Sequence, residues 1–247
     1  MMAAITTMQL GGLAIILSFV SMRLLLLIFK SVVRYPSSIC EGPPRKQWMY
    51  CNISISLVHS FVTAVLSVYS FFDEPAMLSD MIGTWTWISY YLVCFSMGYF
   101  IHDFFDLVFN DLKNSGVILI HHVVVVGAFG IAVFSEKYIG FAMCSLLMEI
   151  NSIFLHVRRL MSFHGFSKTS TIYEINGILL LVTFIMFRFL SSGWMLNYVI
   201  KNRHAMPLAH AVYGSLGMGS LIVINILLFL ILWNSDFKKR LQIKDDY

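Results

Sequence analysis

The chain has 247 residues, of which 58% are hydrophobic and only 12% are charged, and its mean hydropathy is +0.78. A water-soluble domain carries about twice this charged fraction, so the composition excludes an ordinary soluble protein. The net charge of +4 is modest, and because no basic face is clustered outside short loops we expect no nucleic-acid partner.

Seven apolar segments follow one another along the chain, each close to the length of about 20 residues that a helix needs to cross a bilayer. They cover residues 8–29, 52–72, 87–109, 117–134, 138–157, 175–200 and 208–233. The first is too long for the apolar part of a signal peptide, and no small-residue cleavage motif follows it. The sequence therefore predicts an all-α polytopic membrane protein, a bundle of about seven transmembrane helices with a polar-lined interior.

The loops between these segments differ in charge, which predicts the orientation of the chain. About twelve lysine and arginine residues fall on one side of the membrane and about three on the other, and the basic side is normally cytosolic. We therefore expect the C-terminus in the cytosol and the N-terminus outside. The sequon at Asn52 then lies at the cytosolic end of the second segment, and we expect it to carry no glycan.

The four cysteines, at positions 40, 51, 94 and 144, lack zinc-binding spacing. We expect no metal site and no cofactor. Cys94 and Cys144 fall within apolar segments, where a thiol acts as a small hydrophobic group. Cys40 lies near a membrane face, where it is open to acylation.

Several ionisable side chains lie inside the apolar segments. A charged side chain at the centre of a spanning helix costs about 2.5–3.5 kcal/mol on insertion scales, so such residues face one another or a wet cavity. We therefore take them as candidate functional residues: His102, Asp103, Asp106, His121, His122, Glu149 and Arg188.

His102 and Asp106 are four residues apart, so they share one helix face, and Asp103 lies beside them. A carboxylate placed in this way can hold an imidazole in one tautomer. The turn to the fourth segment is short, so we expect antiparallel neighbours in which His121 and His122 meet the His–Asp element at one depth. Two alternatives stay open. The His–Asp element could be wet and inert at the interface, and the His pair could be satisfied by backbone carbonyls.

The fifth segment carries a polar stripe on one face, formed by Ser145, Glu149, Ser152 and His156, while Asn151 projects elsewhere. This stripe is expected to face the bundle, either as a functional surface or only as interhelical hydrogen bonds. A second alternative is that Glu149 is protonated and silent, since burial favours the neutral carboxyl.

Arg188, inside the sixth segment, stays charged and needs an anionic or carbonyl partner. Glu149 and the phosphate of an anionic lipid are the two candidates.

Three stretches, residues 91–103, 120–122 and 147–155, resemble the TLC-domain family, which is named for TRAM, Lag and CLN-type membrane proteins. The resemblance implies three regions. These are a first transmembrane helix with a basic loop over 1–44, the TLC domain over 45–241, and a polar cytosolic tail over 242–247.

Within the family, the element GYFIHD at 98–103, with residues 194–195 and 206–208, most resembles a branch of small TLC-domain proteins. That branch is described as limiting the incorporation of polyunsaturated, fluidising chains into plasma-membrane phospholipids. The resemblance therefore implies a regulator of phospholipid composition and fluidity rather than an enzyme. It implies membrane phospholipids as partners and the plasma membrane as the location, with the endoplasmic reticulum as the alternative. The residues expected to bind lipid are Arg188, Glu149, Asn151 and Asp106.

Ceramide synthases are the enzymatic relatives of this family, and they suggest an alternative function. Their motif has a His pair followed, in the next helix, by a His–Asp pair. His121 and His122 match the first pair, but the next segment carries Glu149 and Asn151 instead, and the His–Asp element comes earlier. This departure favours the regulator.

If the chain were an acyl-CoA-dependent acyltransferase, His121 or His122 would be the general base, assisted by His102 and Asp103, with acyl-CoA as a partner. A third alternative is a modulator that contacts another membrane protein through its lipid-facing helices.

Overall fold

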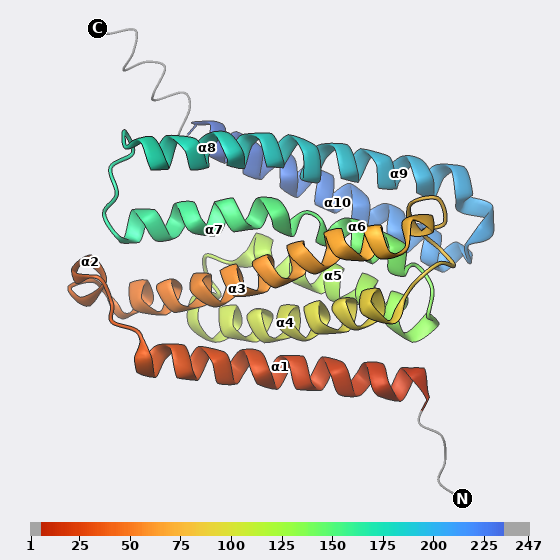
Figure 1. Ribbon diagram of the computed structural model, residues 1–247, viewed down its shortest axis with the longest axis horizontal. Coiled ribbons are helices and arrows are strands. Elements are labelled where there is room, and N and C mark those ends of the chain that lie inside the picture. The colour runs from red at the N-terminus through yellow and green to blue at the C-terminus, as the bar shows by residue number, and fades with distance from the viewer. Residues whose placement is uncertain (1–5, 235–247) are drawn as a thin grey trace, which may run out of the picture.

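The computed structural model describes residues 6–234, so the predicted tail at 242–247 and the basic residues at 238–240 lie outside the described residues. Between residues 6 and 234 the chain forms helices and no strands. Seven of these helical stretches are long and apolar enough to cross a membrane. Figure 1 shows them running along the long axis of the molecule, with α1 at one edge beside α4 and with α8 and α9 at the opposite edge. The prediction of an all-α polytopic membrane protein is confirmed.

The first four spanning helices are α1 (Thr7–Val32), α3 (Pro44–Asp73), α4 (Trp87–Asp111) and α5 (Gly116–Ser135). The fifth spanning stretch combines α6 (Ile139–Leu146) and α7 (Glu149–Phe163). The sixth combines α8 (Thr171–Phe184), the π-helical segment η2 (Ile185–Leu190) and α9 (Ser191–Asn202), and the seventh is α10 (Leu208–Leu232). Three short helices lie in the connections: α2 (Ser37–Cys40), η1 (Pro75–Leu78) and η3 (Arg203–Ala205).

Most predicted spans agree with these helices to within a few residues, but the second begins well before residue 52. Pro44 stands in the first turn of α3, where its fixed φ suits a helix and its missing N–H costs nothing. We call the end of the bundle near the α4–α5 turn (112–115) the inner end, and the end near the α5–α6 turn (136–138) the outer end. By the charge bias of the loops, we expect the inner end to face the cytosol.

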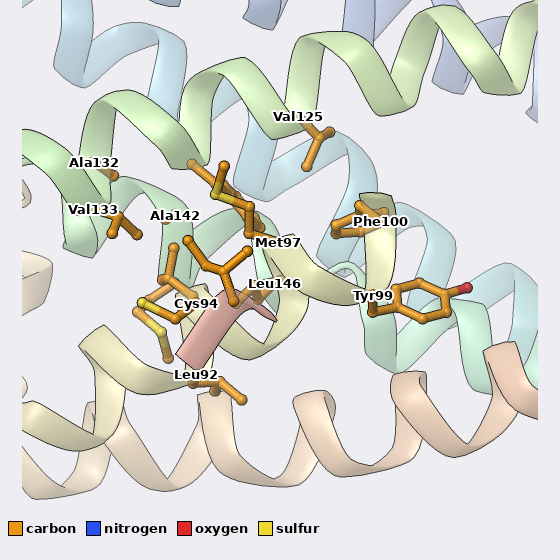
Figure 2. Packing of buried hydrophobic residues seen from close by; sticks show 14 of the residues in the cluster. Leu92, Cys94, Met97, Tyr99, Phe100, Val125, Ala132, Val133, Ala142 and Leu146 are labelled. Atoms are coloured by element: carbon orange, nitrogen blue, oxygen red, sulfur yellow. The ribbon is translucent and has the colours of Figure 1, made fainter. Parts of the chain in front are cut away.

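Helix α4 lies at the centre of the packing and contacts α1, α3, α5 and α6. Figure 2 shows its side chains Met97 and Phe100 within a cluster that also receives Val125 and Val133 from α5 and Leu146 from α6. In a bilayer, close packing rather than transfer from water holds helices together, and this cluster provides it.

Small residues set the crossing of α1 and α4. A Cβ atom added at Gly98 would lie 2.5 Å from the carbonyl oxygen of Ile15 and 2.6 Å from Cβ of Ser18, so the two backbones touch there. The Ser18 hydroxyl also donates to the Phe95 carbonyl at 2.6 Å. The glycine thus permits an approach that any other residue would obstruct.

The loop between α3 and α4 folds back into the outer end of the bundle. Met77 and Met81 are fully buried there. The Tyr138 amide donates to the Ile82 carbonyl at 2.8 Å, and a Cβ atom added at Gly140 would lie 2.7 Å from Cα of Met81. The loop is therefore part of the packed structure, tied to the start of α6.

The fifth and sixth spanning helices are both interrupted in their middle. At 147–148 the amides of Ile150 and Asn151 bond carbonyls three residues back rather than four. Residues 185–190 wind as a π-helix. Such segments inside helices frequently accompany functional sites, because they re-aim side chains.

Candidate functional site

A group of polar side chains fills the inner half of the bundle, and we call it the polar core. Its members come from α3, α4, α5, α7, η2 and α10: His59, Ser60, Asp103, His121, His122, Glu149, Asn151, Ser152, His156, Arg188 and Asn225. His59, Asp103, His122, Asn151, Ser152 and Asn225 are buried, whereas Glu149, His156, Arg188 and His121 are half-buried. The half-buried members keep some accessible surface although they lie in spanning helices.

The predicted meeting of the His pair and the His–Asp element occurs through Asp103 and His122. Asp103 Oδ2 lies 3.6 Å from His122 Nε2 across the α4–α5 contact. The other oxygen of Asp103 accepts from the Asn52 amide at 2.7 Å, and the same amide nitrogen donates to Asp106 at 3.0 Å. One amide therefore joins two buried carboxylates. This is also the nitrogen that a glycan at the sequon would occupy.

Asp106 lies at the inner side of this network, away from the His pair. Its Oδ2 accepts from the Trp48 indole at 2.7 Å, and its Oδ1 lies 3.7 Å from the Arg23 guanidinium. The Arg23 side chain, 51% exposed, reaches Asp106 from α1. Asp106 is thus an anchor for α1 and α3 on α4.

His102 lies apart from the polar core. It is buried against α1, with its ring 5.9 Å from that of Phe19 in an edge-to-face arrangement. Neither ring nitrogen has a hydrogen-bond partner within 6–234, so the expected pairing of His102 with Asp106 does not form. The Asp106 carboxylate is engaged by other side chains: Oδ2 accepts from Trp48 and Asn52, and Oδ1 lies near Arg23.

The imidazoles of the polar core carry free nitrogen atoms. Nδ1 of both His121 and His122 has no hydrogen-bond partner in the described part of the chain, so backbone carbonyls do not satisfy the pair through these atoms. His59, fully buried, stacks on the Tyr99 ring with centroids 3.7 Å apart, and both of its nitrogens also lack a described partner. Buried polar atoms without partners are costly, which marks this region as one that receives a ligand or water.

Glu149 begins α7, directly after the interruption of the fifth spanning helix. Its Oε2 accepts from the Ser60 hydroxyl of α3 at 2.5 Å. The predicted stripe therefore faces the bundle at Glu149 and Ser152.

Arg188 reaches from the π-helical segment into the polar core and bonds neutral groups. Its Nε donates to Asn151 Oδ1 at 2.6 Å, Nη1 to Asn225 Oδ1 at 3.1 Å and Nη2 to Ser152 Oγ at 3.1 Å. Glu149, the carboxylate expected as its partner, makes no ion pair with it among residues 6–234, and its Oε2 accepts instead from Ser60. Asn151, predicted to project away from the stripe, lies toward α8 and the π-helical segment: its Nδ2 donates to the Leu180 carbonyl at 2.9 Å and its Oδ1 accepts from Arg188.

An apolar pocket of about 130 Å³ lies between α5, α6, α9 and α10, on the outer side of the polar core. Its wall includes Val124, Val125, Ala128, Phe141, Ser145, Met195, Gly214, Gly217 and Leu221. Near the outer end, Tyr138 and His210 border it and share a hydrogen bond of 3.2 Å. Gly214 leaves the wall open, since a Cβ atom added there would meet nothing within 4 Å.

The pocket and the polar core follow one another directly along α5 and α10, and in the fifth spanning stretch they lie on either side of the interruption at 147–148. Val125, Ser145 and Leu221 line the pocket. Four residues away on the inner side of each stand His121, Glu149 and Asn225. Residues four apart in a continuous helix lie on one face, about one turn of 5.4 Å from each other, and this applies to the pairs in α5 and α10. The interior is therefore an apolar space that ends at a set of polar groups, the arrangement that an amphiphile requires.

A metal site finds no support in this geometry: within 6–234, no cluster of three or more His, Cys, Asp or Glu side chains is placed to hold an ion.

The site also contains four residues that were not predicted from the sequence: Asn52, His59, Ser60 and Asn225. A signal for the first three was present in α3, where the buried polar residues recur at helical spacing: Ser56, His59, Ser60, Thr63, Ser67 and Ser70.

The TLC-domain family matches residues 49–234 of the chain. TLC domain-containing protein 2 of Danio rerio is 42% identical over 208 residues, covering 84% of this chain and 84% of that protein. The Homo sapiens protein of the same name is 33% identical over 195 residues, 76% of this chain and 71% of the relative. TLC domain-containing protein 1 of Homo sapiens is 30% identical over 210 residues, 84% of both chains. No solved structure matches the chain.

Proposed function

Because the chain belongs to the TLC-domain family, we propose that it regulates the phospholipid composition and fluidity of the plasma membrane, limiting the incorporation of polyunsaturated phospholipids. It does so by holding a membrane lipid inside the bundle. The acyl chain lies in the apolar pocket and the polar end lies among Arg188, Glu149 and Asn151. The observation that carries the proposal is the continuity of pocket and polar core along α5 and α10.

Physical chemistry favours this use of the interior. Ligand sites are mostly apolar cavities with a few polar groups that fix orientation, and helical bundles commonly place them between helices. Here Arg188 and Glu149 stand at the inner end, whereas Tyr138 and His210 at the outer end are hydrogen-bonded to each other, so one orientation of a lipid is favoured. The unpartnered nitrogens of His121 and His122 supply further polar contacts at the inner end.

The test fills the pocket without disturbing the polar core. Gly214→Leu places a side chain where nothing lies within 4 Å of the new Cβ, so the helix is retained and the lumen is occupied. Gly219→Leu is the matched control, since Gly219 is on the same helix, is exposed, and also has open space at its Cβ.

Cells that lack the protein would be complemented with wild type, Gly214→Leu or Gly219→Leu at equal abundance. Their phospholipids would then be analysed by mass spectrometry. Wild type and Gly219→Leu should lower the polyunsaturated fraction, and Gly214→Leu should not. Full restoration by Gly214→Leu would refute the proposal.

A second candidate function, acyl transfer from acyl-CoA, is favoured by one observation. The Asp103 carboxylate contacts Nε2 of His122 and leaves Nδ1 free, as in a general base oriented by an acid. The test supplies labelled acyl-CoA with sphingoid or lysophospholipid acceptors to the purified protein and to a variant with His121→Ala and His122→Ala. A histidine base contributes about 10²–10⁴ in rate, so turnover should vanish in the variant. If wild type shows no turnover and the double variant restores the lipid profile in cells, the acyltransferase function is excluded.

A further inference from the structure

The guanidinium of Arg188 retains hydrogen-bonding capacity that the protein does not use. A guanidinium carries five N–H groups, one on Nε and two on each terminal nitrogen. The three bonds to Asn151, Asn225 and Ser152 use one group on each nitrogen. One N–H on Nη1 and one on Nη2 therefore remain free for an anion, and we call these two groups the guanidinium fork.

Asn225 places a second free donor beside this fork. Its side chain is buried, and Nδ2 has no hydrogen-bond partner among the described residues. The orientation of the amide is fixed by chemistry, because Arg188 has only donors and so must face Oδ1. The Nδ2 group consequently keeps both hydrogens available, on the amide whose Oδ1 is held against Arg188.

The charge near Arg188 limits what can occupy this position. All three bonded partners are neutral, and Glu149, an electrostatic neighbour of Arg188, is bound to Ser60 on the α3 side. His121, another electrostatic neighbour, can donate from its free Nδ1 in the tautomer that protonates that atom. One guanidinium with a carboxylate nearby balances a single negative charge better than a double one.

We propose that Arg188 and Asn225 bind the monoanionic oxyanion of an amphiphile, either a fatty carboxylate or the phosphodiester of a phospholipid. The chain of this ligand extends past Leu221 into the apolar pocket. The inference rests on the proposed function, since it names the chemical class of the lipid held at the same site. Neutral amphiphiles of the same chain bind weakly, because they leave the guanidinium fork unsatisfied.

The test compares ligands that share one chain and differ in charge. The purified full-length protein is offered oleate, dioleoylphosphatidylglycerol or oleyl alcohol, and dissociation constants are measured by native mass spectrometry. At least one of the two anions should bind tenfold or more tightly than the alcohol. Binding of oleate alone identifies a carboxylate ligand, binding of the phospholipid alone a phosphodiester ligand, and binding of both the shared chemistry. Equal affinity for all three would overturn the proposal.

Asn225→Asp sharpens the comparison, because it keeps the oxygen that accepts from Arg188 and replaces the free donor by a negative charge. Anion affinity should fall at least tenfold while the affinity for oleyl alcohol stays the same. Asn197→Asp, the same change at an exposed position of α9, should alter neither. Unchanged anion binding in Asn225→Asp would also overturn the proposal.

The wild-type comparison needs no variant, so it decides the matter even if Asn225→Asp does not fold. Equal binding of anions and alcohol would overturn only the assignment of an anionic ligand. The proposed function is tested separately, by the lipid profile of cells that carry Gly214→Leu.

Discussion

Asp103 and His122 face each other from neighbouring helices, with Oδ2 and Nε2 3.6 Å apart, and Nδ1 of this imidazole has no hydrogen-bond partner among residues 6–234. The other oxygen of Asp103 accepts from Asn52 at 2.7 Å, so both oxygens of the carboxylate are engaged. A histidine held in this way presents Nδ1 in one fixed direction. The pair thus links the α3–α4 interface to the polar core.

Replacement of this carboxylate tests its role in holding three helices. Asp103→Ala removes one of the two hydrogen bonds of the Asn52 amide and the carboxylate that faces His122, and a hydrogen bond to a carboxylate contributes about 1.5–3 kcal/mol. The free energy of unfolding should fall by about that amount or more, measured by thermal or denaturant unfolding of the protein in detergent. Asp103→Asn keeps an oxygen for Asn52 and should lose less. Equal stability of wild type and Asp103→Ala would show that the contacts contribute nothing.

The close approach of α1 and α4 predicts opposite effects for two glycine substitutions. Gly98→Ala puts a methyl group 2.5 Å from the backbone oxygen of Ile15, and overpacking of this kind costs about 1–3 kcal/mol. Gly12→Ala, where nothing lies within 4 Å, should be neutral or stabilising by about 0.4–1 kcal/mol, since alanine restricts the unfolded chain. Unfolding temperatures of the two variants measure the difference. A stabilising Gly98→Ala would contradict the packing described for α1.

The four cysteines allow a test of burial and orientation together. Cys40 is exposed, whereas Cys51, Cys94 and Cys144 are buried. A membrane-impermeant maleimide should label one thiol per chain in permeabilised cells and none in intact cells, because we expect Cys40 to face the cytosol. Cys40→Ser should abolish the labelling. Labelling in intact cells would reverse the orientation, and labelling of several thiols would contradict the burial.

The loop that closes the outer end predicts a dependence on pH. The Gly83 amide donates to Asp80 Oδ1 at 3.0 Å and the Thr84 hydroxyl to Oδ2 at 3.1 Å, and these bonds, the Gly83 amide first, hold the pKa of Asp80 below its ordinary value of 3.8. A carboxyl whose pKa is lowered by folding stabilises the protein at every pH above its ordinary pKa. That contribution is lost as the pH falls through the lowered pKa.

Asp80→Asn should therefore unfold at a lower temperature than wild type near neutral pH. Acidification below about pH 4 should narrow the gap between the two proteins, because wild type then loses the same contribution. The measurement is the difference in unfolding temperature between wild type and Asp80→Asn across a pH series. The contributions of carboxylates that both proteins share cancel in this difference. A gap that stays constant would show that Asp80 contributes no charge-dependent stability.

The spanning helices could be predicted from the sequence because hydropathy and length fix them. Their internal winding could not, since no glycine or proline marks residues 147–148 or 185–190. The partners of Arg188, Asn151 and Ser152 rather than Glu149, were not predicted either.

The spacing of residues along a helix showed which candidate residues share a face. It did not show which neighbouring helix each face contacts. His102 and Asp103 are adjacent in the sequence, yet they lie on different faces of α4. Asp103 faces His122 of α5, whereas His102 faces α1 and packs on Phe19. The stripe of serines and His59 in α3 was legible in the sequence, but without its neighbours nothing distinguished it from ordinary helix–helix hydrogen bonding.

The bonds of Arg188 also bear on how the chain enters the membrane during synthesis. An arginine at the centre of a helix opposes insertion by about 2.5–3.5 kcal/mol when that helix stands alone. Asn151 and Ser152 belong to the preceding helix, so they are already in place when Arg188 emerges from the ribosome, and Asn225 follows with the last helix. We therefore expect the fifth, sixth and seventh spanning helices to leave the translocon together. The fifth helix bonds the guanidinium of Arg188 first, and the seventh helix adds the bond from Asn225 afterwards.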